Sequence, residues 1–217
     1  MDFQRARTEE QITHRQKEII NACDALYGKS NFDSVTIKDI SELTSFTRSA
    51  IYNYYKTKEE IFLDLMQQEY MDWYIEVKVK FEDTESMTKE EFCRFLTESL
   101  VKREKMLRLL SIHLTAIENN CRIEKLIDFK KNAAVVFKIF YMGIDKFFPD
   151  TPIRVKKAFR SEFFIYIFGI YPFTHLSKKQ KTAMKEAHVI FNTMSFRRLC
   201  FHGMCLLAAN LVEKEPE

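Results

Sequence analysis

One short segment of the sequence, residues 44–58, concentrates side chains that can hold and read a polyanion. Its three charged residues, Arg48, Lys56 and Lys58, are all basic. Hydroxyl, phenol and carboxamide groups stand between them, and such groups bond to phosphate oxygens and to base edges in DNA grooves. Because an arginine fork matches two acceptors of guanine in the major groove, Arg48 is the first candidate for a base contact. The segment therefore predicts nucleic-acid binding.

Two short helices would position these side chains. A helix over residues 48–54 fits the pattern, with Thr47 as its N-cap, because a threonine oxygen there can accept a bond from a free backbone N–H. Ala50 and Ile51 give this helix a small inward face and leave its polar side chains outside. The preceding stretch, 36–43, predicts another short helix, and the tight turn between the two makes a helix-turn-helix candidate.

This region resembles the DNA-binding domain of the TetR family of transcriptional regulators. The resemblance runs from about residue 15 to residue 66 and rests on Thr36-Ile-x-x-Ile40, Phe46-Thr-Arg-Ser-Ala-Ile-Tyr52, Tyr54-Tyr-Lys56 and Lys58-Glu-Glu-Ile61. One departure lies in the turn, where the family usually carries an Ala-Gly-Val-like sequence and this chain has Leu43-Thr-Ser-Phe46. Without glycine, a turn residue must adopt an awkward backbone conformation or the turn must differ.

The resemblance implies DNA contacts for nine residues. The candidates for base edges are Lys38, Arg48, Ser49 and Asn53, and those for phosphates are Thr36, Thr47, Tyr52, Tyr54 and Lys58. The alternative is an ordinary solvated face on a small helical hairpin. A homodimer is also implied, since two reading helices must meet two half-sites about 34 Å or a multiple apart on double-stranded DNA.

The composition favours an all-α fold. Only 4 Gly and 4 Pro occur in 217 residues, too few for many strands and turns, while 20 Phe and a hydrophobic fraction of 46% indicate a packed protein. Thr57, Thr88 and Ser177 each open a capping box, and Thr151 with Pro152 predicts another helix start. The expected helices span residues 9–27, 36–43, 48–54, 57–81, 88–102, 106–117, 123–148 and 152–173. Another helix is expected to begin at Ser177, with apolar residues along it as far as Met194, and a last one begins near Phe196.

Three parts are expected along the chain: a helix-turn-helix domain at 1–56, a connecting long helix and loop at 57–87, and a helical sensor and dimerisation domain at 88–217. By resemblance, the last part would bind a small effector. Its many Phe and Met residues suit a hydrophobic or aromatic molecule, although the same residues can simply form core. Polar-tipped or pliant side chains on its apolar helices are the pocket candidates: His113, Tyr141, Met142 and Tyr166.

The stretch from Phe163 to Tyr171 is apolar on every side, so its helix must be buried from two directions. One side can face the core of its own subunit and the other a second subunit. The candidates for the dimer interface are Phe164, Phe168, Tyr171, Met184 and Phe191.

Charge and cysteine usage narrow the class of protein. The net charge of +3 is weak evidence for nucleic acid, and residues 1–56 carry as many acidic as basic side chains, so the case depends on where the charges lie. The five cysteines show no C-x-x-C pair, and the N-terminus is polar with no signal peptide. The longest apolar run falls short of the ~18 residues that a membrane span needs. A cytoplasmic protein without membrane association is expected.

The predicted function is sequence-specific transcriptional regulation by a homodimeric repressor, which a small ligand would release from a palindromic operator. We expect no cofactor, metal site or catalytic residue, because the sequence has no Gly-rich phosphate loop and no nucleophile elbow. His202 and Cys205 lie three apart, but a core pair explains them more simply than a metal site. One alternative replaces the effector with a protein partner, and another is an enzyme or metal-dependent module on a helical bundle.

Overall fold

The computed structural model describes residues 9–189 and 194–214, and within these ranges all regular structure is helical. The predicted all-α class is confirmed. The chain divides into two compact units: residues up to Gln68 join His113–Asn132, while Glu69–Ile112 join the residues from Ala133 onward. Two helices, α4 (Lys58–Asp83) and α7 (Ile123–Phe147), contribute residues to both units.

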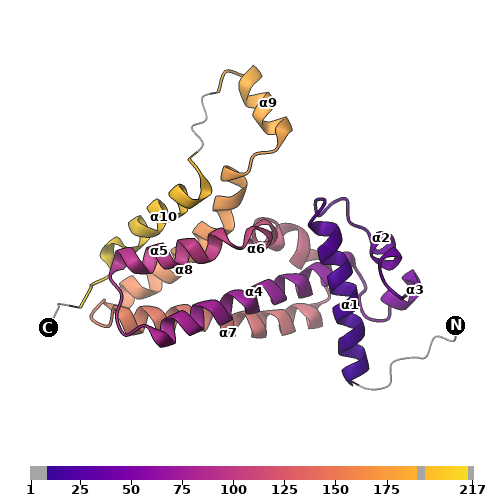
Figure 1. The fold of residues 1–217 in the computed structure, drawn as a ribbon, viewed down its shortest axis with the longest axis horizontal. Helices are drawn as coiled ribbons and strands as arrows, with labels where there is room; N and C mark the ends of the chain where they lie inside the picture. Colours follow the sequence, from indigo (N-terminus) through magenta and orange to yellow (C-terminus); the bar gives the residue numbers. More distant parts are fainter. Residues whose placement is uncertain (1–8, 190–193, 215–217) are drawn as a thin grey trace. The chain divides into compact units, whose positions relative to one another are not determined.

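The N-terminal unit begins with three helices that match the predicted helix-turn-helix (Figure 1): α1 (Glu9–Tyr27), α2 (Ile37–Glu42) and α3 (Arg48–Ile51). Helix α1 packs against α2, and α2 packs against α3. Their shared core buries Ile19 and Cys23 of α1 with Ile40 and Ile51. The unit is completed by the start of α4, a π-helical turn η1 (His113–Ile117), a 3-10 turn η2 (Glu118–Asn120) and the start of α7.

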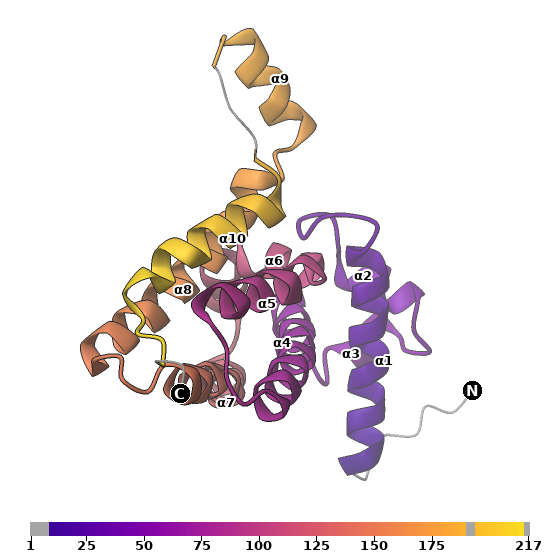
Figure 2. The ribbon, with the colours of Figure 1, turned by 60° about the vertical axis from the view of Figure 1, so that its left-hand side comes forward.

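The C-terminal unit contains the rest of α4 and α7 with α5 (Lys89–Val101), α6 (Glu104–Leu110), α8 (Ile153–Thr174), α9 (Lys178–Glu186), α10 (Phe196–Leu207) and the 3-10 turn η3 (Ala208–Asn210). Helix α10 lies along α5 and α8, which Figure 2 shows from the side. Helix α9 stands clear of the rest of this unit in both views, and none of its residues is buried.

Aromatic rings form the core of the C-terminal unit. The fully buried Trp73 lies with its ring centroid 4.8 Å from that of Phe140 and 6.3 Å from that of Phe163. The indole N–H of Trp73 donates to the Ser99 hydroxyl at 3.0 Å, which satisfies its one polar group. Phe81 joins this core from the far end of α4 and stacks on Phe92. Close ring packing of this kind buries large apolar surfaces and holds the helices of the unit together.

The helices predicted at 106–117 and from Ser177 onward end earlier than expected. The helix predicted at 106–117 stops at Leu110, and a π-helical turn follows. The helix from Ser177 stops at Glu186, because Ala187 takes the C-cap position and His188 adopts a left-handed φ of 54°. Its predicted continuation therefore ends before Phe191, which lies outside the described residues.

The predicted helix caps are observed only in part. The boxes at Thr88 and Ser177 are confirmed, with both reciprocal bonds present. At Thr57 one half of the predicted box forms, since its hydroxyl accepts from the Glu60 N–H at 3.3 Å. The Glu60 carboxylate accepts from the Lys56 N–H at 2.8 Å instead of reaching back to Thr57. Thr151 does not cap α8; its hydroxyl accepts from the Val212 N–H at 2.7 Å and fastens the C-terminal segment.

Candidate nucleic-acid interface

Helix α3 presents the polar side chains that the sequence singled out. Its N-cap is Thr47, whose hydroxyl accepts from the Ala50 N–H at 3.3 Å and lies 3.0 Å from the Ser49 hydroxyl. Ala50 and Ile51 are buried, whereas Arg48, Ser49 and Asn53 are exposed and Tyr52 is half-buried. The predicted inward and outward faces are therefore both observed, although the helix proper ends at Ile51 and turns cover the next three residues.

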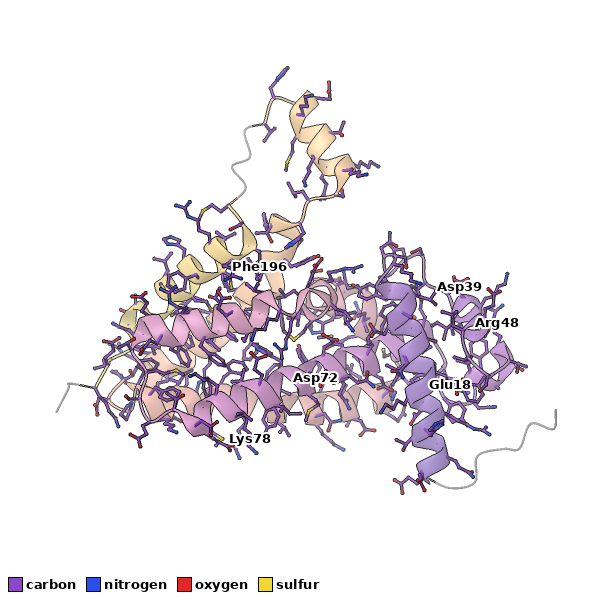
Figure 3. The ribbon with its side chains drawn as sticks, in the orientation of Figure 1. Glu18, Asp39, Arg48, Asp72, Lys78 and Phe196 are labelled. Carbon is purple, nitrogen blue, oxygen red and sulfur yellow. The ribbon has the colours of Figure 1, made fainter. Side chains whose placement is uncertain are left out.

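The Arg48 guanidinium is placed by its own helix. It lies 5.9 Å from the Tyr52 ring, and its Nη2 donates to the Tyr52 hydroxyl at 3.4 Å. Figure 3 labels Arg48 on α3, Asp39 on α2 and Glu18 on α1. A single weak contact leaves most of the five guanidinium donors available for a ligand.

Helix α2 is fixed at its start by a full capping box. The Thr36 hydroxyl accepts from the Asp39 N–H at 3.2 Å and donates to the Asp39 carboxylate at 2.7 Å. These hydrogen bonds from Thr36 hold the pKa of Asp39 below its usual range. Lys38 lies 3.8 Å from Glu42, but both side chains are well exposed, so the pair is screened by water and Lys38 is free to move toward a ligand.

An open hollow of about 540 Å³ lies between the start of α2 and the α3 segment. Its lining contains four basic side chains, Lys38, Arg48, Lys56 and Lys58, and one acidic side chain, Glu59. A concave surface with this excess of positive charge suits a phosphate group. Lys56 was named as part of the basic segment but not as a contact residue; its position beside the other cations is what the sequence could not show.

Lys58 has a different role from the one predicted. Its ammonium donates to three backbone carbonyls, those of Phe32 at 2.8 Å, Val35 at 3.2 Å and Asp33 at 3.4 Å, and it lies 4.3 Å from the Phe32 ring centroid. Since a lysine ammonium has three donors, these bonds use all of them. Lys58 therefore anchors the loop before α2 and contributes charge to the hollow, but has no donor left for a phosphate.

Tyr54 is tied to α1, because its hydroxyl accepts from Arg15 Nη1 at 3.4 Å. The phenol proton is still able to reach an acceptor. The next residue, Tyr55, is fully buried and donates to Asp64 at 2.7 Å, so the pair of tyrosines separates into one outward and one inward side chain.

Glu60 connects the start of α4 with the start of α7 inside the N-terminal unit. Its fully buried carboxylate accepts from the Arg122 side chain at 2.6 and 2.8 Å and from the Arg122 N–H at 3.1 Å. Burial by itself would raise the pKa of Glu60, but hydrogen bonds from Arg122 and from the Lys56 N–H outweigh it, and the pKa lies below its usual range. The same carboxylate thus links Lys56, which follows α3, to Arg122 at the start of α7.

The four predicted effector residues belong to different units: His113 lies in the N-terminal unit, and Tyr141, Met142 and Tyr166 lie in the C-terminal unit. His113 is buried beside Glu118 in the N-terminal unit, with Nε2 3.3 Å from the carboxylate. Tyr141 lies under the Arg160 guanidinium at 4.0 Å, Met142 is 53% exposed, and Tyr166 donates to the Leu199 carbonyl at 2.7 Å. None of them lines the hollows of about 360 and 250 Å³ on the C-terminal unit. Helical spacing in the sequence identified apolar helices, but it could not show which face of each helix is exposed to solvent.

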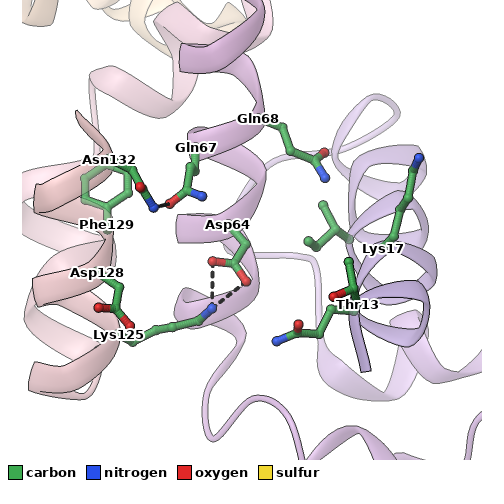
Figure 4. Close-up of a pocket in the computed structure, with 11 residues that line it drawn as sticks. Thr13, Lys17, Asp64, Gln67, Gln68, Lys125, Asp128, Phe129 and Asn132 are labelled. Atoms are coloured by element: carbon green, nitrogen blue, oxygen red, sulfur yellow. Dashed lines mark hydrogen bonds and ion pairs between the residues drawn. The ribbon is translucent and has the colours of Figure 1, made fainter. Parts of the chain in front are cut away.

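A further groove of about 450 Å³ lies in the N-terminal unit between α1, α4 and α7 (Figure 4). Lys125 donates to both oxygens of Asp64, at 2.8 and 2.6 Å, and Asn132 donates to Gln67 at 3.0 Å. The lining is polar, so this groove does not match the apolar effector cavity that was predicted.

The predicted interface residues divide between the core and the surface of the C-terminal unit. Phe164 packs on Phe137 with ring centroids 4.3 Å apart, and Phe168 is also half-buried. Tyr171 donates to Glu104 at 2.9 Å, and Met184 is half-buried on α9. Open apolar surface does exist on α8 and α10, at residues that were not singled out: Ile165 (72% exposed), Phe173 (64%) and Leu206 (64%).

Three further features concern the described residues: possible groups of metal ligands, the Cys23 thiol and long apolar helices. None of its His, Cys, Asp and Glu side chains gather in a group of three or more that would hold a metal ion. Cys23 is buried, and burial raises the pKa of its thiol to about 12, which makes it unreactive. No helix within these ranges has both the length and the apolar character that crossing a bilayer requires.

Comparison with known proteins agrees with this geometry. Residues 19–65 match the family model described as bacterial regulatory proteins, tetR family, and residues 67–208 match the tetracyclin repressor-like C-terminal domain. The HTH-type transcriptional regulator YfiR of Bacillus subtilis is 32% identical over 60 residues, which cover 28% of this chain and 29% of YfiR. The chain thus aligns with less than a third of the length of this curated relative.

Solved structures share the fold across almost the whole chain. The fatty acid degradation regulator FadR from Bacillus halodurans has a TM-score of 0.56 at 14% identity, covering 92% of this chain and 97% of that one. A TetR-family protein from Mesorhizobium loti MAFF303099 has a TM-score of 0.57 at 12% identity, covering 94% and 98%. FadR from Thermus thermophilus, solved with lauroyl-CoA, has a TM-score of 0.53 at 14% identity, covering 93% and 97%.

Two adjoining family models cover most of the sequence, and the capped helix-turn-helix with its exposed polar side chains lies within the first of them. The chain belongs to the TetR family of bacterial transcriptional regulators.

Proposed function

We propose that this regulator is a homodimeric repressor that binds a palindromic operator through α3 and is released by a small apolar molecule. The observation that carries the DNA-reading part is the arrangement around α3: Arg48, Ser49 and Asn53 are exposed on a helix that is capped and backed by buried residues. In this proposal residues 1–56 read DNA, residues 57–87 connect, and residues 88–217 sense the effector and dimerise.

Among the predicted contacts, Lys38, Arg48, Ser49 and Asn53 would meet base edges. Thr36, Thr47, Tyr52 and Tyr54 would meet phosphates, and Lys56 takes the place first given to Lys58, because it lines the basic hollow and Lys58 is engaged with carbonyls. Lys56 Nζ donates to the Tyr52 carbonyl at 2.9 Å, which leaves two of its donors for a phosphate.

Dimerisation is supported by the apolar surface of the C-terminal unit. Ile165, Phe173 and Leu206 are large side chains that water covers in a single chain, and burying them against a second copy would be favourable. The half-buried Phe164, Phe168 and Tyr171 would back this surface, and Met184 would add to it from α9.

An apolar effector is supported by the aromatic composition of the same unit. The similar structure from Thermus thermophilus holds lauroyl-CoA, so acyl thioesters are the first compounds to test. A ligand that changed operator affinity about 100-fold would supply about 2.7 kcal/mol of coupling between its site and the DNA site.

The test is selection of binding sequences from a random DNA pool by the purified protein, with its oligomeric state measured by sedimentation. We expect a palindrome whose half-sites lie about 34 Å or a multiple apart, bound by a dimer. Failure to enrich any sequence would refute the proposal, and so would binding by a single chain to one half-site.

Lauroyl-CoA, free fatty acids and aromatic compounds are then added to the operator complex, with transcription from an operator-bearing promoter as readout. Release of DNA and a rise in transcription support the effector and the repressor role. If no compound stabilises the protein or loosens DNA, the alternative of control by a protein partner is favoured.

A further inference from the structure

Two side chains of helix α1 contact the chain just before and just after α3. Glu18 Oε1 accepts from the Ser45 N–H at 2.6 Å, in the turn just before α3. Arg15 lies 5.5 Å from the Phe46 ring centroid and donates to the Tyr54 hydroxyl at 3.4 Å, just after α3. Since residues at i and i+3 share one face of a helix, a single face of α1 contacts the chain on both sides of α3.

The turn between α2 and α3 contains no glycine. His188 is the one described non-glycine residue with a positive φ, so no residue of the turn is left-handed. Three of the turn N–H groups find acceptors nearby: that of Leu43 bonds to Ile40 O, that of Thr44 to Ser41 O and that of Phe46 to Thr44 Oγ1. The Ser45 N–H has its acceptor on α1, the Glu18 carboxylate. A bond to a charged acceptor is shorter and stronger than a neutral one.

Helix α3 itself contributes few buried side chains. It is four residues long and buries two small-to-medium side chains, Ala50 and Ile51. A helix this short makes few packing contacts, so its orientation depends on how its two ends are held. Because a bidentate arginine contact is sensitive to angle, a small rotation of α3 would misplace Arg48 against a base.

We propose that Glu18, assisted by Arg15, is a positioning residue for DNA reading. Its carboxylate holds the turn through the Ser45 N–H, in place of a glycine in the turn, and sets the direction in which α3 presents Arg48, Ser49 and Asn53. This inference rests on the proposed role of α3 in reading DNA. Glu18 itself touches no base; it acts through the turn.

The test compares Glu18→Ala with Glu18→Gln and with Glu10→Ala. Alanine removes both the charge and the acceptor, whereas glutamine removes the charge and keeps an oxygen that can accept the same bond. Glu10 is an exposed acidic residue in the first turn of the same helix and serves as the charge control. The difference between the alanine and glutamine variants at position 18 therefore isolates the hydrogen bond.

In Glu18→Ala we expect operator affinity to fall about tenfold, equivalent to about 1.4 kcal/mol, while binding to random DNA stays as in the wild type. Base preference at the position read by Arg48 should flatten, and the salt dependence should keep its slope because phosphate contacts are retained. Glu18→Gln and Glu10→Ala should stay within about threefold of the wild type, a difference of less than 1 kcal/mol.

Amide hydrogen exchange at Ser45 provides a second readout that needs no DNA. Exchange should quicken in Glu18→Ala and stay slow in Glu18→Gln. Unchanged exchange in the alanine variant, an equal loss of affinity for operator and random DNA, or unaltered base preference would each overturn the positioning role. If the wild-type protein enriched no sequence, the proposed function would fail instead, and the exchange measurement would still decide whether Glu18 holds the turn.

Discussion

The short helix α3 and the long helix α8 are held in place by opposite means. Helix α3 has 4 residues and depends on hydrogen bonds from Thr47 at its start and from α1 around it. Helix α8 has 22 residues and packs Phe159, Phe163 and Ile167 into an aromatic core. Polar tethers fix direction and leave a face open to a ligand, whereas ring packing supplies stability but covers the faces that it uses.

This difference predicts that the two regions fail differently. Changes in the C-terminal core should lower the free energy of unfolding, and changes around α3 should alter DNA binding in a protein that stays folded. Substitutions in each region test this separation.

The largest loss of unfolding free energy is expected for Phe163→Ala. Its ring is 1% exposed and packs on Trp73 and Phe140, so truncation leaves a cavity and should cost about 3–5 kcal/mol of unfolding free energy. Denaturant unfolding followed by the fluorescence of the single tryptophan, Trp73, measures it directly. Val79→Ala, at a 52% exposed position on α4, should change stability by less than about 0.5 kcal/mol. Equal effects of the two changes would contradict the packed core.

An intermediate loss of stability is expected for Arg122→Met. The change leaves the buried Glu60 carboxylate with only the N–H groups of Lys56 and residue 122 as donors, and should cost about 2–3 kcal/mol of stability. Thermal unfolding of this variant beside Lys131→Met, whose ammonium makes a loose exposed pair at 3.7 Å, measures the loss. A stable Arg122→Met protein would show that the carboxylate does not need its ion pair.

The same carboxylate predicts a pH dependence. The pKa of Glu60 lies below its usual range in the folded protein, so its contribution is complete above the unfolded value of about 4.3 and is lost as pH falls through the folded pKa. The Tm of the wild type should therefore drop more steeply in acid than that of Glu60→Gln. Parallel curves for the two proteins would remove Glu60 as a cause of acid sensitivity.

A smaller effect, confined to binding, is expected for Arg48→Ala. We expect operator affinity to fall by about 1–3 kcal/mol, with relaxed preference at one base pair. Thermal unfolding should match the wild type because the Arg48 side chain is exposed. The control is Lys29→Ala, an exposed cation between α1 and α2 outside the basic hollow. If both variants bound operator equally, Arg48 would not read a base.

The smallest effect is expected for Thr47→Ala, which removes the N-cap of α3. Such a loss costs about 1 kcal/mol of helix stability, here concentrated in four residues. Operator binding should weaken while the Tm changes little, and Thr47→Ser should restore binding because it keeps the capping oxygen. A falling Tm with unchanged binding would reverse the separation between the two regions.

Features that depend on neighbours within one turn of helix could mostly be predicted from the residues alone. Thr47, Thr88 and Ser177 cap the helices predicted for them, because a capping oxygen and its N–H partner lie three residues apart in the chain, whereas Thr151 bonds to Val212 instead. The outward direction of Arg48, Ser49 and Asn53 followed from the same local pattern, since Ala50 and Ile51 define the buried side of α3.

The pairing of polar groups that are distant in the chain could not be predicted from the sequence and depends on how the helices pack. Glu18 meets Ser45, Lys58 meets the carbonyls of the loop at 32–35, and Glu60 meets Arg122, which lies 62 residues further along. The sequence does not identify the partner of a charged side chain, because any of several oppositely charged or hydrogen-bonding groups could pair with it. The packing of whole helices chooses among them, and that packing depends on apolar contacts far from the polar groups themselves.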